Sequence, residues 1–176
     1  MNLGLKKGTV KLVTHDNTWK KIFEKEEKLI KKNFGNLVLG IEHIGSTSID
    51  GILAKPIIDI NIGVKSTKDF QKSTNILENI GYVRIKNKNA PHVHLIFAKG
   101  SKKLGTTHYL HLIKYKGAIY NHDIYFRDYL RTHKTTAKQY AELKKKLEKK
   151  YPNNRMAYTK DKQSFFEKIS KNIIKN

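Results

Sequence analysis

The sequence predicts an α+β fold with a helical layer in its C-terminal part. Two features of the chain lead to this prediction. Residues from about Val10 to Tyr115 mix β-rich runs with loops, whereas the chain from Tyr120 onward has helical periodicity and a single proline, Pro152. A strand-rich stretch followed by a helix-rich one is typical of α+β proteins.

The length of 176 residues fits one domain with a substantial hydrophobic core. No internal repeat divides the chain. We expect the domain to span residues 13–170, with an N-terminal extension over residues 1–12 and a frayed end over residues 171–176.

The first elements are an amphipathic helix and a strand. Apolar residues recur at helical spacing from Trp19 to Phe34, and Asn17 or Thr18 is the candidate N-cap. A strand is predicted from Leu37 to Ile44, and the turn Gly45–Ser48 ends it.

The remaining elements follow from alternation, helical spacing and turn residues. Lys55 and Pro56 precede an alternating strand from Ile57 to Val64, and a helix from Thr67 to Ile80 ends at Gly81. Further strands are predicted at 82–85, 92–97 and 108–115, with a loop at 100–105, and further helices at 123–132, 136–150 and 161–174.

Charge and composition restrict the classes of function. Lys and Arg total 36 against 15 Asp and Glu, for a net charge of +21, and such a field attracts nucleotides, nucleic acids and other polyanions. The excess is mostly Lys, which can equally reflect an AT-rich genome. The absence of Cys excludes disulfides, thiolate metal sites and cysteine nucleophiles. No apolar run approaches the roughly 20 residues that cross a bilayer, and the N-terminus does not resemble a secretion signal, so we expect a cytoplasmic protein with no membrane partner.

The most specific constellation is the Gly45-Ser46 turn followed by Asp59 and Asn61 on the next strand. Because side chains alternate along a strand, Asp59 and Asn61 emerge on one face while the neighbouring isoleucines face the core. Their oxygens suit Mg²⁺, which binds one or two carboxylates alongside phosphates, and the free N–H groups at the turn suit a phosphate. Alternatively, the turn is an ordinary one and Asp59 is a solvated or capping residue.

Several segments in this order resemble the GrpB family, a group within the polymerase-β-like nucleotidyltransferase superfamily. They are 41–48 (IEHIGSTS), 54–60 (AKPIIDI), 107–111 (THYLH), 126–131 (FRDYLR) and 140–144 (YAELK). The resemblance runs from about Val13 to Lys168. It implies a nucleotidyltransferase-like mixed sheet backed by helices, with a Gly-Ser turn and an acid-x-acid pair for the catalytic metals. The superfamily's general activity is transfer of a nucleoside monophosphate from a nucleoside triphosphate to an acceptor hydroxyl.

The chain departs from the superfamily pattern at its acids. Asn61 replaces the second acid of the pair, and no clear third acid is found on the later strand, which carries His108, Tyr109 and His111. Alternation places Tyr109 and His111 toward Asp59 and His108 away from it. His111 is therefore a candidate general base, or a ligand for a divalent ion other than Mg²⁺, with a structural hydrogen-bonding role as the equal alternative.

Four other polar residues lie near these strands. Glu42 and His43 precede the Gly-Ser turn and point to opposite faces, so we expect one of them to support the turn, and Glu42 is also a candidate metal ligand. His92 and His94 share one strand face, but two histidines without a third ligand favour a solvated pair over a zinc site.

The predicted phosphate ligands are mainly basic side chains. Arg127 and Arg131 lie four residues apart on one helix face, and guanidinium groups match phosphate oxygens and offset charge on a leaving pyrophosphate. A salt bridge with Asp128 or another acid is the alternative. Lys55, just before the Asp59 strand, is a further candidate, and Lys144 is a lesser one.

Two functions follow from these residues. The first is an enzyme that binds a nucleoside triphosphate and Mg²⁺ through Gly45, Ser46 and Asp59 and transfers a nucleoside monophosphate to an acceptor hydroxyl. The second is a catalytically weak module on the same fold that binds a nucleotide, another phosphorylated small molecule or RNA. Asn61 and the missing third acid are the basis of the second.

Overall fold

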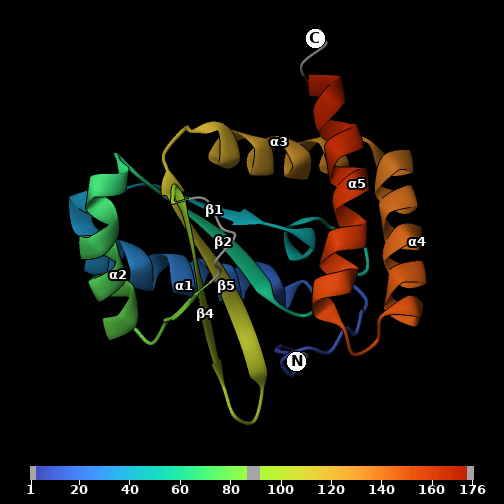
Figure 1. Cartoon of the computed structure of the whole chain (residues 1–176), viewed down its shortest axis with the longest axis horizontal. Helices are drawn as coiled ribbons and strands as arrows, with labels where there is room; N and C mark the ends of the chain where they lie inside the picture. Colours follow the sequence, from blue (N-terminus) through green and yellow to red (C-terminus); the bar gives the residue numbers. More distant parts are fainter. Residues whose placement is uncertain (1–2, 87–91, 174–176) are drawn as a thin grey trace.

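The computed structural model describes residues 3–86 and 92–173. Its strands are β1 (Val38–Ile44), β2 (Ile58–Val64), β3 (Val83–Ile85), β4 (His94–Ser101) and β5 (Gly105–Lys114). Its helices are α1 (Thr18–Phe34), α2 (Phe70–Asn79), α3 (Ala118–Thr132), α4 (Lys134–Lys150) and α5 (Arg155–Ile173). The predicted mixed α+β architecture is confirmed, and Figure 1 shows α4 and α5 standing side by side beyond one end of the sheet.

The sheet is mixed because one of its strand pairs is parallel. The five strands lie in the order β1-β2-β5-β4-β3, in which β2 and β5 run parallel and every other neighbouring pair runs antiparallel. A parallel pair needs a long crossover, and here the crossover contains α2, β3 and β4. In this order both strands of the parallel pair lie inside the sheet, with β5 as the central strand.

The two faces of the sheet differ in polarity, as the alternation along β2 predicts. Ile58, Ile60 and Ile62 are fully buried in the main core, which also receives apolar side chains from α1 and α2. Asp59 and Asn61 lie on the opposite face, which α3 approaches through contacts with β1 and β5. Burial of the isoleucines thus fixes which way the polar residues of β2 point.

A second core joins the C-terminal helices to the segment after the Gly-Ser turn. Phe126 of α3, Tyr140 of α4 and Ile169 of α5 pack with Ile49 and Ile52. This packing holds the helical layer beside the polar face of the sheet.

Several predicted boundaries are wrong. The predicted 100–105 loop is shorter, a turn at 102–104 that joins β4 and β5 into a long hairpin. At two helix starts, local capping groups were overlooked. The helix predicted from 161 begins at Arg155, where the Asn154 side chain accepts a hydrogen bond from the Ala157 N–H. At the start of α1, Asp16 Oδ1 accepts the Thr18 N–H at 2.9 Å, whereas Asn17 makes no side-chain cap bond.

The predicted N-terminal extension is hydrogen-bonded to the rest of the chain. Leu5 forms a β-bridge with Thr106, and the Gly4 N–H donates to the Pro56 carbonyl at 2.7 Å. Arg155 donates to the carbonyls of Thr9 and Lys6. At the other end α5 reaches Ile173, and residues 174–176 of the predicted frayed end lie outside the described residues. Among the described helices, none is both long and apolar enough to cross a membrane.

Candidate active site around Asp59

The Gly-Ser turn lies directly against Asp59. Gly45 follows β1 with φ of 69°, and the strand register places Ile44 opposite Asp59. A Cβ atom on Gly45 would collide with the Asp59 carboxylate and lie 3.0 Å from its Cβ. Only glycine combines this backbone conformation with such a close approach, so the local sequence explains the contact. Ser46 then begins a single 3₁₀ turn, Ser46–Ser48.

Asp59 is half-buried and its carboxylate is available. Within the described part of the chain, Asp59 takes part in no hydrogen bond or ion pair. Burial raises the pKa of its carboxyl group, and the positive charges of Lys55, Lys162 and Arg155 oppose that rise. An unpaired carboxylate can accept a metal ion, and the three cations beside it can attract an anionic ligand.

Asn61 is completely buried and is hydrogen-bonded to an acid that sequence reasoning missed. Its Nδ2 donates to Asp123 Oδ2 at 2.9 Å, while its Oδ1 has no hydrogen-bond partner among the described residues. Burial raises the pKa of Asp123 to about 6. The hydrogen bond from Asn61 acts in the opposite direction, and the negative charge of Asp59 adds to the rise. Asp123 lies on α3 one helical turn before Arg127. This spacing places Asp123 on the helix face of the predicted phosphate ligands, and it could have identified Asp123 as a site residue.

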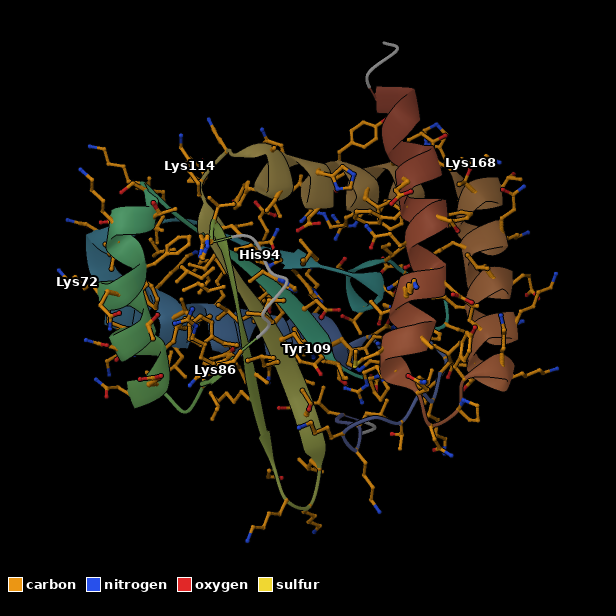
Figure 2. The ribbon with its side chains drawn as sticks, viewed as in Figure 1. Lys72, Lys86, His94, Tyr109, Lys114 and Lys168 are labelled. Carbon is orange, nitrogen blue, oxygen red and sulfur yellow. The ribbon has the colours of Figure 1, made fainter. Side chains whose placement is uncertain are left out.

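The strand β5 brings Tyr109 and His111 to the same face, as predicted. Tyr109 pairs with Asp59 and His111 with Asn61. His111 Nδ1 lies 2.8 Å from His94 Nε2, and burial lowers the pKa of both histidines to about 4. The interpretation of His94 as solvated was therefore wrong. Figure 2 shows His94 and Tyr109 on the neighbouring strands β4 and β5, with Tyr109 nearer to α5.

Two of the predicted residues have clear structural contacts. His108 faces the other side of the sheet, where its Nδ1 lies 2.9 Å from Thr107 Oγ1. His43 is buried, stacks on Phe23 and places Nε2 3.0 Å from Thr47 Oγ1. Burial lowers the pKa of His43 to about 3, so the ring is neutral and supports the turn.

Arg127 and Arg131 are occupied by protein partners. Arg127 donates to Glu42 Oε2 at 2.7 Å, to the His43 carbonyl at 3.0 Å, and to both carboxylate oxygens of Asp128. Arg131 Nη2 and Nε both donate to the Ser48 carbonyl. The two arginines thus brace the Gly-Ser turn from α3, and Glu42 serves as an ion-pair partner.

A cleft of about 1000 Å³ opens on the arginine side of the turn. Residues from α1, the turn and the junction between α3 and α4 line it, including Glu42, His43 and Ser48, but Asp59 does not. Two ion pairs lie within its wall, His15–Asp50 at 3.3 Å and Arg127–Glu42 at 2.7 Å, and the Arg131 guanidinium group is held by the Ser48 carbonyl. We therefore place the candidate chemistry at Asp59, where charged groups lack protein partners.

The lysines predicted as phosphate ligands lie on the Asp59 side. Lys55 is close enough to Asp59 that each alters the pKa of the other. Lys144 is buried at 1% exposure, and its ammonium group donates to the Leu53 carbonyl. Lys162 and Arg155, both from α5, complete the positive charge around Asp59. Arg155 lies before the predicted start of that helix at residue 161, and Lys162 was missed because no local pattern shows how the helix docks on the sheet.

The family model for GrpB protein matches residues 9–172. The chain belongs to the GrpB family. It is 43% identical over 170 residues to the glutamate-rich protein GrpB of Alkalihalophilus pseudofirmus, covering 95% of this chain and 97% of that protein. It is 33% identical to the UPF0157 protein YqkA of Bacillus subtilis, covering 94% of this chain and 48% of that protein.

Solved structures agree with this membership. The conserved protein GrpB from Enterococcus faecalis matches with a TM-score of 0.82 at 30% identity, covering 94% of this chain and 98% of that chain. The Cid1 poly(U) polymerase, solved with MgGTP bound, matches with a TM-score of 0.51 at 10% identity over 77% of this chain and 44% of that chain. The second likeness shows that this GrpB-family chain has a nucleotidyltransferase-like fold.

Proposed function

We propose that this GrpB-family protein binds a nucleoside triphosphate with Mg²⁺ at Asp59 and transfers the nucleoside monophosphate to an acceptor hydroxyl. One observation carries the proposal. The Gly-Ser turn packs on a carboxylate that makes no ion pair or hydrogen bond with the described residues, in a chain with a nucleotidyltransferase-like fold. The turn N–H groups and the carboxylate would then face one ligand from two adjacent strands.

The oxygens at the site fit one hard cation. Asp59 supplies a carboxylate, and the Asn61 Oδ1 is a buried oxygen without a donor among the described residues. Leaving such an oxygen unsatisfied costs about 1–3 kcal/mol, which a bound cation would recover. The described part of the chain contains no group of three or more His, Cys, Asp or Glu side chains that could hold a metal ion by themselves. The oxygens around Asp59 therefore favour a single cation whose remaining ligands are phosphate oxygens and water.

The residues support the following chemistry. The acceptor oxygen forms a bond to the α-phosphorus while the bond from that phosphorus to the bridging oxygen breaks, and pyrophosphate leaves with the electron pair. Asp123 takes the hydroxyl proton, because a carboxylate with a pKa of about 6 is well matched to proton transfer near neutral pH. Mg²⁺, when bound, would neutralise negative charge on the phosphate oxygens. His111 is a weaker base, since burial lowers its pKa to about 4.

The test is nucleotide binding by the Asp59→Asn variant. Calorimetry with each common nucleoside triphosphate, with and without Mg²⁺, should show Mg²⁺-dependent binding by the wild-type chain and at least about a tenfold loss in the variant. Asp50→Asn is the matched control, because the Asp50 side chain is 99% exposed and lies outside the Asp59 site. Unchanged binding by a folded Asp59→Asn variant would refute the proposal. Pyrophosphate release in the presence of hydroxyl compounds then identifies the acceptor.

Nucleic-acid binding is the second candidate, and the charge distribution gives it less support. The labelled lysines in Figure 2 lie on different sides of the molecule, with Lys72 on α2 and Lys168 on α5 at opposite ends. A nucleic-acid interface needs its positive charge gathered on one face. An RNA-binding function predicts affinity that falls steeply between low and physiological salt, so weakly salt-dependent binding would exclude it.

A further inference from the structure

Three lysine side chains converge on two tyrosine rings beside Asp59. The Lys55 Nζ lies 5.1 Å from the centre of the Tyr158 ring, and the Lys144 Nζ lies 4.6 Å from the centre of the Tyr140 ring. The Lys162 Nζ lies between them, 6.0 Å from the Tyr140 centre and 5.9 Å from the Tyr158 centre. We call Lys55, Lys144 and Lys162 the lysine cluster.

The positive charge of the lysine cluster exceeds the negative charge of the carboxylates near it. Its members interact electrostatically with one another, and among the described residues Asp59 is the carboxylate whose charge acts on Lys55 and Lys162. No salt bridge among the described residues includes any of the three lysines. Buried or half-buried lysines are ordinarily paired, because removing an ammonium group from water is costly.

A lysine on the other face of the sheet shows the ordinary arrangement. Lys99 lies over the Tyr82 ring at 5.2 Å, much as the cluster lysines lie over tyrosines. Its Nζ also forms a 2.8 Å ion pair with Glu26, whereas the cluster lysines have tyrosine contacts and no carboxylate partner within that distance. Cation–π contacts contribute only about 0.5–2 kcal/mol each. Lys144 also donates to the Leu53 carbonyl, which leaves the ammonium groups of Lys55 and Lys162 without an ion-pair partner among the described residues.

Burial lowers the pKa of two of these lysines, that of Lys55 to about 7 and that of Lys144 well below its usual range, in each case with help from Lys162. Burial acts on Lys162 in the same direction, but Tyr140 and Asp59 outweigh it and raise the pKa of Lys162. A polyanion beside the cluster would favour the charged forms.

Two of the three lysines, Lys55 and Lys162, are accessible from solvent on the Asp59 side, whereas Lys144 is 1% exposed and lies behind them. Lys55, Asp59, Tyr109 and Lys162 are all half-buried rather than fully buried. Arg155, also half-buried, donates to the Tyr109 hydroxyl at 2.9 Å and adds a further positive charge at this opening. A ligand held at Asp59 could therefore extend toward α5 and the lysines.

We propose that the lysine cluster binds a chain of at least two linked phosphates, which is the chemistry of a di- or triphosphate tail. This inference rests on the proposed function, because it assigns the tail of the same ligand whose α-phosphate lies at Asp59. Linked phosphates suit the cluster better than a single phosphate, since the ammonium groups are distributed over two rings instead of around one point. Lysines act as point charges and can serve successive phosphates along such a chain.

The experiment measures binding of inorganic tripolyphosphate, pyrophosphate, phosphate, ATP and AMP to the full chain, with EDTA present. Lys162→Gln and Lys55→Gln remove one charge each from the cluster. Lys168→Gln is the matched control, because this exposed lysine lies on the same helix as Lys162. Circular dichroism verifies the fold of each variant, and stabilisation of the wild-type chain by each probe gives a second readout that needs no substitution.

The wild-type chain should bind tripolyphosphate at least about tenfold more tightly than phosphate, and ATP more tightly than AMP. Either cluster variant should lose about tenfold in tripolyphosphate affinity, while Lys168→Gln stays within about twofold. No tripolyphosphate binding by the wild-type chain, equal affinity for phosphate, or equal losses in cluster and control variants would overturn the inference. If it fails while Asp59→Asn still abolishes Mg²⁺-dependent nucleotide binding, the proposed function stands without it.

Discussion

The two sides of the Gly-Ser turn use positive charge in opposite ways. On one side Arg127 and Arg131 donate to carboxylates and backbone carbonyls of the protein itself. On the other side Lys55 and Lys162 face Asp59 without an ion-pair partner among the described residues. A basic side chain is therefore a candidate ligand-binding group when the fold gives it no acidic partner, whether it is an arginine or a lysine.

The largest expected effect is on the paired side. Arg127→Ala would leave Glu42 and the His43 carbonyl without their donor, and we expect a loss of about 2–4 kcal/mol in the free energy of unfolding. Urea denaturation measures it. A loss no greater than that of Lys145→Ala, whose ion pair with Glu142 is exposed, would show that the arginine is free for a ligand after all.

The next largest loss of stability is expected from a substitution in the Gly-Ser turn itself. Gly45→Ala should cost about 2–3 kcal/mol in stability, because it adds a collision with Asp59 to the strain of a positive φ. Gly51→Ala is the control, since Gly51 has φ of 75° but no atom within 4 Å of an added Cβ, and it should cost about 1 kcal/mol. Equal losses in the two variants would contradict the close packing of the turn on Asp59.

The titration of Asp123 should make the stability of the protein depend on pH. Its pKa of about 6 in the folded state exceeds the unfolded value, so its contribution to stability is lost as pH rises from about 4 through 6. Asp123→Asn keeps an oxygen for the Asn61 amide and should raise the free energy of unfolding by about 1–2 kcal/mol at pH 7.5, with little gain at pH 4. Thermal melts in EDTA across this range test it. The same gain at both pH values would exclude titration of Asp123 as the cause.

The smallest effect is expected on the unpaired side. Burial lowers the pKa of Lys55 to about 7, so its contribution to stability is lost as pH falls from its unfolded pKa toward 7. Lys55→Gln should therefore raise the free energy of unfolding by about 1 kcal/mol at pH 7 and change it little at pH 10. Melting temperatures at the two pH values measure this. Destabilisation at pH 7 would indicate that Lys55 has a structural partner.

The sequence predicted the fold, and it predicted that Gly45 and Asp59 lie together with Asn61 on the same face as Asp59, because short-range rules determine these placements. Alternation along β2 placed Asp59 and Asn61 together, and the positive φ required at Gly45 matched the turn signal. The parallel pairing of β2 with β5 then brought Tyr109 and His111 beside them, as alternation predicted.

The residues that were missed reach the site from helices distant in sequence. Asp123 and Lys162 lie on α3 and α5, and no local pattern reveals how those helices dock on the sheet. For the same reason Arg127 could not be assigned to Glu42, which is 85 residues away in the chain. His94 was misjudged because its partner His111 lies on the adjacent strand rather than on its own.

Arg155 fastens the last helix to the first residues of the chain, through the Thr9 and Lys6 carbonyls, and to Tyr109 in the sheet. During synthesis, these three regions cannot meet until α5 has left the ribosome. A nascent chain that stops before Lys162 would already contain every strand, yet it would lack a full set of cations around Asp59. Under the proposed function, a chain truncated before Arg155 should therefore bind its nucleotide more weakly while keeping the five strands of the sheet.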